Sequence, residues 1–495
     1  MGLPDLYPAQ VGSPYTTLAA PYTTGEATMT VVDATKLPDA PNLVCLAGSV
    51  AGEFRYSGKD GNTLLGVVKL PGTPNATWPA GTYAFRGVAA YDTNALQTRA
   101  MFATAPDLPN RVVYETDEVG NTLEIHQVYI PPFYGAGLPD ANLNGASFGD
   151  IWFDKYLACQ FDASNVSRGS VSANDPGSNG AASKPHVVPW TDINWTNAKI
   201  AIENRGGAAN RKSGTCTALA EASASKFYVE DVTHLIGKRV YVTQAGVRYV
   251  RRVVRTGGDT TADPNAAKLL ELYPALPAPI TAADTYEILH YYLPGGYEWM
   301  SLYVWAYMNL YQYGLGWPKG NTDWGKFHGD PRERVYEGLP DPVRPGYNGN
   351  AIARTLTGSG PLSWSLNGKE SGIWDLVGNC WEWCDLLVGT TADNTIDAGY
   401  PAAGTKLPSA NGYVASLYAP APEGEYSLGA EVFAPATLGP SNANYDEAYY
   451  WQATGQRAAL RGGTFHSGAR CSLASLYLDL APSYVSTNLG FRGVC

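Results

Sequence analysis

The chain has 495 residues, of which 45% are hydrophobic and 16% charged, with a formal net charge of −11. A chain of this length is too long to form one ordinary hydrophobic core, so roughly two to four domains are predicted. Abundant Gly, Pro and Tyr favour turn-rich β structure. The acidic balance excludes the basic footprint of a nucleic-acid-binding protein, and the apolar runs are all shorter than the roughly 20 residues that span a bilayer.

The first hundred residues predict a small β module over 1–107. The N-terminal segment lacks the charged and apolar regions of a signal peptide, so we expect synthesis in a cytoplasm. Short runs with β-branched or aromatic residues then alternate with turn signals, and helical periodicity is absent. These runs are 27–32, 43–46, 53–56, 64–68 and 83–88.

A second β module is predicted over 216–290, because residues 225 to 290 repeat the same plan of strands and turns. The basic cluster from Arg248 to Arg255 lies in this module and alternates with Val and Tyr, which indicates a strand with one charged face. The two modules resemble small β domains of phage tail and baseplate-associated proteins, although any small antiparallel β module has similar spacing.

Two helices are predicted in the remainder. Residues 191–203 form an amphipathic pattern with Thr191 or Asp192 as N-cap and Gly206 as the stop. Residues 297–313 are aromatic on several faces, so that helix must be buried on most sides. The Gly/Ser/Asn-rich stretch 172–183 predicts a mobile loop.

The cysteines do not form a disulfide framework, because an odd number is spread thinly over a long chain. Cys380 and Cys384 are four residues apart, so a zinc site has to be considered, but no CxxC motif or His pair accompanies them. We therefore expect buried free thiols, no metal and no cofactor. No acidic cluster has EF-hand-like spacing, but whether calcium stabilises the loops stays open. The seven cysteines are Cys45, Cys159, Cys216, Cys380, Cys384, Cys471 and Cys495.

Five short motifs follow in a fixed order over roughly residues 110 to 495. Their glycines suit tight turns, and their tryptophans and Phe491 supply apolar area that ties loops together as core framework. The motifs are WFDKY at 152–156, LPGGYEW at 293–299, GIWDLVGNCWEW at 372–383, LRGG at 460–463 and NLGFR at 488–492.

Together these motifs resemble the superfamily of the formylglycine-generating enzyme. The resemblance implies an α+β class: a C-type-lectin-like domain over 108–495, into which the module at 216–290 is inserted. One branch of that superfamily consists of oxidising enzymes that use a pair of cysteines between the Gly-Gly and Gly-Phe-Arg motifs. Only Cys471 lies there in this chain, so an oxidising enzyme is the alternative and a non-enzyme the expectation.

Another branch contains the variable proteins of diversity-generating retroelements, including phage tropism determinants, and the segment from Arg461 to Arg492 resembles it most. In that family AAC codons are rewritten at their adenines while neighbouring residues stay fixed. The resemblance implies nine variable, ligand-binding positions, each occupied by a residue that an AAC codon reaches through its first two bases. They are Thr464, His466, Ser467, Arg470, Tyr477, Asp479, Leu480, Tyr484 and Ser486.

The residues at these positions suit binding even without the family, because aromatic, Arg and small polar side chains are typical of evolved binding surfaces. An ordinary surface strand pair is the alternative, and Phe465 is predicted to be core. The resemblance implies a phage receptor-binding protein at the tail fibre tip of the virion. It would form a homotrimer that contacts tail components and a host-surface receptor, protein or glycan. A cell-displayed bacterial variable protein is a third hypothesis, which neither a lipobox nor a signal peptide supports.

Overall fold

The computed structural model divides the chain into two compact units, which are treated separately below. The first comprises 1–107, 131–149 and 304–317, and the second comprises 108–130, 150–303 and 318–495. The structure describes residues 15–37, 40, 42–47, 51–69, 73, 75–86, 107–131, 133–134, 147–232, 235, 237–257, 265–313, 316–329, 338–343, 353–389, 394–401, 403–418, 431–440 and 445–495. The predicted domain limits at 107, 216 and 290 stay a prediction.

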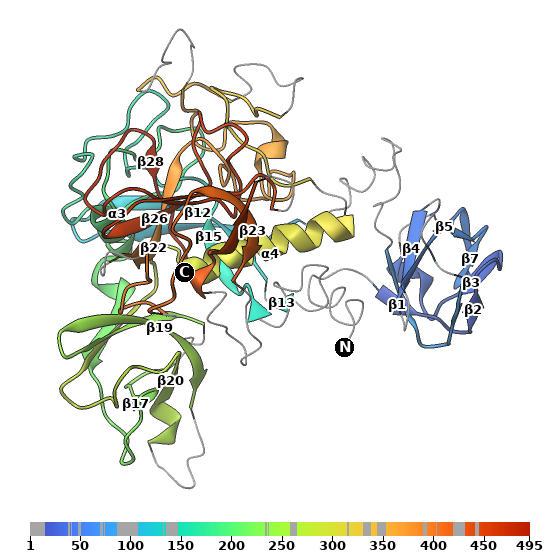
Figure 1. Cartoon of the computed structure of the whole chain (residues 1–495), viewed down its shortest axis with the longest axis horizontal. Coiled ribbons are helices and arrows are strands. Elements are labelled where there is room, and N and C mark those ends of the chain that lie inside the picture. The colour runs from blue at the N-terminus through green and yellow to red at the C-terminus, as the bar shows by residue number, and fades with distance from the viewer. Residues whose placement is uncertain are drawn as a thin grey trace. The chain divides into compact units, whose positions relative to one another are not determined.

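Among the described residues the fold is mainly β (Figure 1). Its two α-helices are α3 (Trp195–Glu203) and α4 (Gly296–Tyr313). The predicted α+β class therefore overstates the helical part; short β-branched and aromatic runs separated by Gly and Pro fold as strands instead. In the part of the chain that the structure describes, no helix combines the length and apolar character needed to cross a membrane.

The first unit contains a small β fold, drawn in blue in Figure 1. Its core includes Tyr22, Phe54 and Trp78, with the Phe54 and Trp78 rings edge-on at 5.3 Å. Strands are found within the predicted runs 27–32, 43–46 and 53–56, which confirms these three. The run 64–68 is divided between two strands, and residues 87–88 of the run 83–88 lie outside the described residues. In pairing order the strands are β1 (Tyr15–Thr17), β10 (Tyr83–Arg86), β4 (Asn42–Ala47), β5 (Ala51–Tyr56) and β8 (Val68–Lys69); β2 (Tyr22–Thr23) and β9 (Thr77–Trp78); and β3 (Thr28–Thr30), β7 (Thr63–Leu65) and β6 (Gly58–Asp60). Beyond them lie β13 (Phe133–Tyr134), β14 (Ser147–Phe148) and the 3-10 turn η1 (Ala34–Lys36).

The main body of the second unit is built on two sheets. The first has the order β11 (Asn110–Thr116), β12 (Thr122–Ile130), β15 (Ile151–Asp154). The second has the order β24 (Pro435–Gly439), β23 (Gly412–Leu417), β25 (Tyr449–Gln452), β27 (Leu476–Leu478), β26 (Arg457–Arg461), β22 (Trp381–Val388), β28 (Leu489–Gly490). Two of its pairs, β25 with β27 and β22 with β28, are parallel, which brings distant parts of the C-terminal region together.

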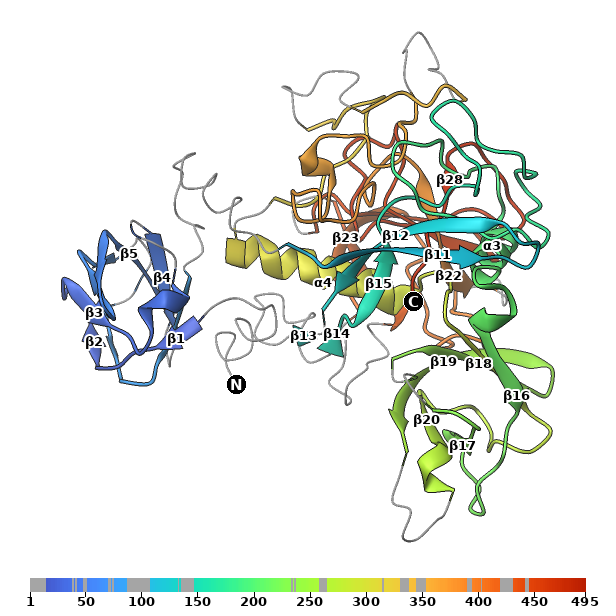
Figure 2. The same ribbon diagram turned by 180° about the vertical axis from the view of Figure 1, so that it is seen from behind.

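The predicted second module, 216–290, contributes five strands to a six-stranded antiparallel sheet, drawn mainly in green in Figure 2, and the sixth strand, β16, precedes residue 216. The order of this sheet is β16 (Arg211–Thr215), β21 (Thr285–Leu289), β18 (Arg239–Gln244), β19 (Val247–Thr256), β20 (Leu269–Tyr273), β17 (Lys226–Tyr228). Its core contains Phe227, Val253 and Leu270. The other 3-10 turns are η3 (Gly207–Asn210), η4 (Ala266–Lys268) and η5 (Leu362–Trp364).

The prediction of one charged face on β19 is wrong, because Arg251 and Arg252 are neighbours whose side chains point to opposite faces and both are buried. Arg252 is 1% exposed and donates to Glu298 and Glu431, which lie outside the module. On β18, Arg239 is also buried and donates to Asp385 of β22 at 2.6 Å. These bonds join the six-stranded sheet to the rest of the second unit. Removing one partner of such a buried pair costs about 3–5 kcal/mol.

Helix α3 begins later than predicted. Asn194 is its N-cap and accepts from the backbone N–H of Asn197, while Asp192 has a left-handed φ of 60° and lies before the helix. Asn174 accepts from the Asn194 N–H at 2.8 Å, and Trp190 Nε1 donates to the Ala173 carbonyl. The stretch 172–183 is therefore bonded to the start of α3, which differs from the mobile loop expected from its composition.

Helix α4 matches its prediction closely. It spans Gly296–Tyr313, and Tyr297, Trp299, Met300 and Tyr303 on different faces are each at most 3% exposed. The aromatic pattern on several faces thus indicated a buried helix correctly.

Candidate functional site

A buried frame holds the C-terminal segment. Arg492 is fully buried and donates from Nη2 to Glu382 Oε1 at 2.7 Å, and from Nη1 to the Asp154 carbonyl at 3.1 Å. Gly463 has a φ of 99°, and a Cβ there would lie 2.2 Å from Cys471 Sγ, so a side chain does not fit. These contacts fix both ends of the segment that carries the predicted variable positions.

The framework aromatics are buried as predicted. Trp374, Trp381, Trp383 and Phe491 are between 0% and 6% exposed. Phe465 is 4% exposed and packs edge-on against Trp324, with ring centroids 5.1 Å apart, which confirms that it belongs to the core.

Between these fixed points the chain forms a pocket of about 360 Å³, which we name the variable pocket. Seven of the nine predicted variable positions line it, although they span 21 residues of sequence from 466 to 486. Its lining residues are Trp381, Trp451, His466, Ser467, Arg470, Tyr477, Leu480, Tyr484, Ser486, Asn488 and Leu489.

An aromatic wall forms one side of the variable pocket. Tyr477 lies on β27 opposite Trp451 of β25, with ring centroids 5.4 Å apart, and its ring is 5.2 Å from that of Trp381. Burial, and next the Asp479 carboxylate that accepts from its hydroxyl at 3.2 Å, raises the pKa of Tyr477 to about 12. Tyr477 therefore presents a neutral hydroxyl and a rigid apolar face, which is suited to ligand contact.

The other lining positions differ in character. Tyr484 is 48% exposed, and the Arg470 guanidinium lies 4.7 Å above the Tyr449 ring centroid. Burial lowers the pKa of His466, so its imidazole is neutral near pH 7 and can both donate and accept. Ser486 Oγ donates to Asn488 Oδ1. The pocket therefore combines cationic, aromatic and small polar groups.

A smaller hollow of about 260 Å³ shares His466, Ser486 and Asn488 with the variable pocket. Trp324, Ala353, Phe465 and Thr487 complete its lining. The two hollows thus form one continuous surface around His466.

Two predicted positions lie outside the pocket lining. Thr464 is 1% exposed and its hydroxyl donates to the Asn379 carbonyl at 3.3 Å, so it supports the frame and does not contribute to the surface. Asp479 is exposed, and its only role at the pocket among the described contacts is to accept a hydrogen bond from the Tyr477 hydroxyl.

The sequence assigned Trp381 and the NLGFR motif to the core framework alone, but Trp381, Asn488 and Leu489 also line the pocket. Trp451 was not predicted in the site; the aromatic run at 449–451 was a usable signal, but only the β25–β27 pairing shows where it lies.

The cysteines offer little nucleophilic character. The six cysteines that the structure describes are buried and free. Burial raises the pKa of the Cys471 thiol to about 12, and its Sγ lies 3.6 Å from the Thr464 carbonyl oxygen. A neutral thiol is a poor nucleophile and a poor metal ligand. Within the described ranges, no group of three or more His, Cys, Asp or Glu side chains is placed to hold a metal ion.

Comparison with known proteins gives structural neighbours only; no family model and no curated protein matches this chain. Treponema denticola variable protein 1 aligns at 12% identity with a TM-score of 0.29, over 78% of this chain and 98% of its own. The Major Tropism Determinant P3c variant aligns at 12% identity with a TM-score of 0.18, over 91% and 83%. The I1 variant aligns at 12% with a TM-score of 0.19, over 96% and 83%. Because these identities and TM-scores are low, a functional proposal has to rest on the geometry of the pocket and not on the similarity.

Proposed function

We propose that the variable pocket binds a ligand on a host-cell surface and that the seven predicted variable positions in its lining are diversified. The main support is that these positions, which the family resemblance implied, come together around one pocket. An ordinary surface strand pair would scatter such positions over both faces of its strands, because alternate side chains point in opposite directions.

The separation between frame and surface supports the proposal. The frame residues Arg492, Gly463 and Phe465 are buried, whereas Tyr484 and Asp479 are exposed. Exchanging exposed side chains on a rigid scaffold usually changes stability by about 0.5 kcal/mol or less, so the pocket can vary while the fold stays constant.

The composition of the pocket supports binding of a macromolecule. Tyr, Trp and Arg dominate binding hot spots because they bury large areas with few rotatable bonds. Tyr477, Tyr484, Trp451 and Arg470 supply these groups here. The ligand changes with the residues, so a protein or a glycan receptor is compatible with the same frame.

The finer assignment follows the sequence resemblance. The chain is proposed to be a C-type-lectin-like receptor-binding protein of a phage tail fibre, attached to tail components and assembled as a homotrimer. Three copies would turn weak single-site binding into strong attachment through avidity. Light scattering of the purified chain tests this: a trimer mass is expected, and a monomer mass removes the avidity argument.

Sequencing the DNA that flanks the gene tests diversification. We expect a nearby near-copy of the 3′ end and a reverse-transcriptase reading frame. The mismatches should fall at adenines of the template, in the codons for the pocket positions. A flanking region without such a repeat, or mismatches concentrated in the codons of Arg461–Gly463 and Gly490–Arg492, overturns the retroelement origin.

A further inference from the structure

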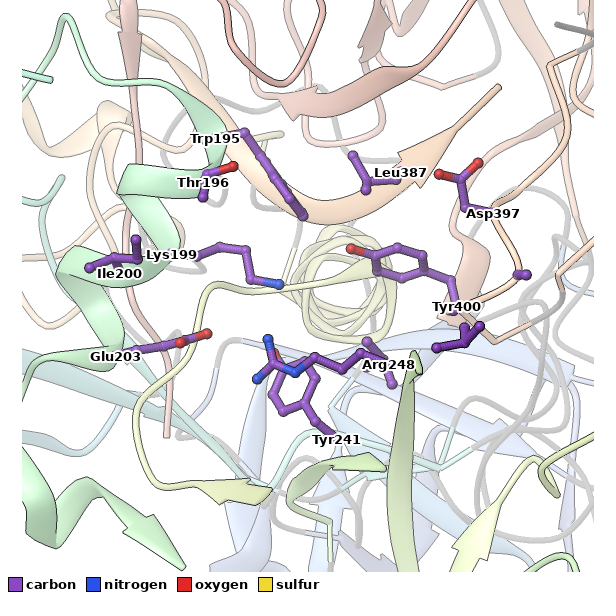
Figure 3. Close-up of a pocket in the computed structure, with 14 residues that line it drawn as sticks. Trp195, Thr196, Lys199, Ile200, Glu203, Tyr241, Arg248, Leu387, Asp397 and Tyr400 are labelled. Atoms are coloured by element: carbon purple, nitrogen blue, oxygen red, sulfur yellow. The ribbon is translucent and has the colours of Figure 1, made fainter. Parts of the chain in front are cut away.

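A second pocket of about 440 Å³ lies where α3 faces the inserted module (Figure 3). We name it the α3 pocket. It is lined by Trp195, Lys199 and Glu203 of α3, by Tyr241 and Arg248 of the module, and by Tyr400. It shares no lining residue with the variable pocket, and its volume falls in the range of about 300–1,000 Å³ typical of small-molecule sites.

The base of the α3 pocket is fixed by Asp385. Its Oδ1 accepts from Lys199 Nζ at 2.7 Å and from the Tyr400 hydroxyl at 2.9 Å. Its Oδ2 accepts from Arg239 Nη1 at 2.6 Å and from the Tyr241 hydroxyl at 3.0 Å. Four donors fill this carboxylate, so Asp385 orients the lining side chains and offers little to a ligand.

Glu203, in contrast, has unused acceptor capacity. It is 7% exposed, and its Oε1 is buried without a hydrogen-bond partner among the described residues. Its Oε2 is 3.6 Å from Arg211 Nη2, which is beyond hydrogen-bond distance. A buried carboxylate oxygen without a donor is costly, and a ligand donor in the pocket would remove that cost.

Donors face Glu203 across the same space. Lys199 Nζ has three N–H groups and donates one to Asp385, which leaves two directed elsewhere. Arg248 donates from Nη2 to Glu287 at 2.5 Å, and its guanidinium lies 3.8 Å over the Tyr241 ring. Its side chain is 41% exposed, which places it at the mouth with N–H groups left for a ligand. Figure 3 shows Lys199, Glu203 and Arg248 directed toward the same space.

The surrounding charges select the kind of ligand. A cationic ligand would meet Lys199 and Arg248, the two cationic side chains in the pocket lining. The aromatic faces are also occupied by a cation, since Lys199 Nζ lies 4.6 Å from the Trp195 ring centroid. An anion would be repelled by the acidic side chains of Glu203 and Asp397, which both line the pocket. A hydroxyl group donates and accepts without net charge, so it satisfies both Glu203 and Lys199.

We propose that the α3 pocket binds a small neutral carbohydrate of one or two sugar units, with hydroxyls donating to Glu203 and accepting from Lys199 and Arg248. Adjacent sugar hydroxyls match groups four residues apart on one helix face, which are near neighbours. This site is separate from the variable pocket and does not depend on its diversification.

Isothermal titration calorimetry of the full chain tests the proposal with D-glucose, D-galactose, D-mannose and N-acetyl-D-glucosamine. Glycine and inorganic phosphate serve as the zwitterionic and anionic probes. We expect at least one sugar to bind with a Kd of about 1 mM or tighter. Saturable binding of glycine or phosphate without any sugar, or binding of none of the probes, overturns the proposal.

Two variants locate the binding. Glu203→Ala removes the acceptor and should weaken sugar binding by at least about tenfold, the effect of losing a hydrogen bond to a charged group. Thr196→Trp places an indole in the pocket from an exposed position of α3 and should abolish binding without disturbing the core. Tyr484→Ser in the variable pocket should leave sugar affinity unchanged. Sugar binding that survives both α3 variants, or that is lost only in Tyr484→Ser, assigns it elsewhere and contradicts the α3 site.

Discussion

Replacing Arg492 with Leu should destabilise the second unit far more than any exchange in the variable pocket. The guanidinium donates from Nε and Nη2 to both carboxylate oxygens of Glu382, and further to the Asp154 and Trp374 carbonyls. Both Arg492 and Glu382 are fully buried. Removal leaves a buried carboxylate without its counter-charge, which costs about 3–5 kcal/mol.

Tyr484→Ser is the matched control, because Tyr484 is 48% exposed and lies in the same segment. Its expected cost is about 0.5 kcal/mol. Urea unfolding followed by tryptophan fluorescence gives both values as changes in the free energy of unfolding. The double variant Arg492→Leu with Glu382→Leu should recover part of the loss, since no unpaired charge remains. The frame argument is refuted if Arg492→Leu costs less than about 1 kcal/mol, or if Tyr484→Ser costs as much as Arg492→Leu.

Further predictions concern backbone, pH and binding. Gly463→Ala should lower the urea midpoint strongly, because its φ is 99° and a Cβ would meet Cys471 Sγ at 2.2 Å; Gly468→Ala, with φ 55° and no described atom within 4 Å of the added Cβ, should cost only about 1 kcal/mol. Equal midpoints for the two would contradict the close approach. Burial raises the pKa of Asp375 from 3.8 to about 6, so its stabilising contribution is full below pH 3.8 and is lost as the pH rises through 6. Compared with Asp375→Asn, the wild-type chain should lose about 2.4 kcal/mol between pH 4 and 7 in urea titrations, and parallel pH profiles would argue against it. Tyr477→Ala should abolish binding to a selected ligand while the unfolding midpoint moves little; a ligand affinity that is unchanged would remove Tyr477 from the site.

Local sequence patterns predicted the parts of the fold that depend on local physics. The strands of the six-stranded sheet follow from β-branched runs and turn residues, and α4 follows from an aromatic pattern that has to be buried. The variable positions came from a motif resemblance, and their grouping around one pocket depends on how the framework closes.

Long-range contacts account for what the sequence did not reveal. The β25–β27 pairing places Trp451 beside Tyr477, and sequence spacing carries no information about this partner. Lys199 and Asp385 are 186 residues apart in the sequence, so no local pattern could predict the base of the α3 pocket. Arg252 belongs to a basic run, and its acidic partners Glu298 and Glu431 come from distant segments. These ion pairs offset the desolvation cost of burying the guanidinium, which the local sequence cannot show. Asn194 became the N-cap because Asp192 takes a left-handed backbone conformation.

Selection from a displayed library tests whether the variable pocket binds ligands while its frame stays fixed. The library randomises the pocket positions His466, Ser467, Arg470, Tyr477, Leu480, Tyr484 and Ser486 and is selected against an unrelated immobilised protein. A control library randomises the exposed β11 positions Val112, Tyr114 and Thr116. The account predicts pocket variants with a Kd of about 1 μM or tighter and parental unfolding temperatures, and no such binders from β11. Equal yields from both libraries, or pocket variants that unfold, would contradict it.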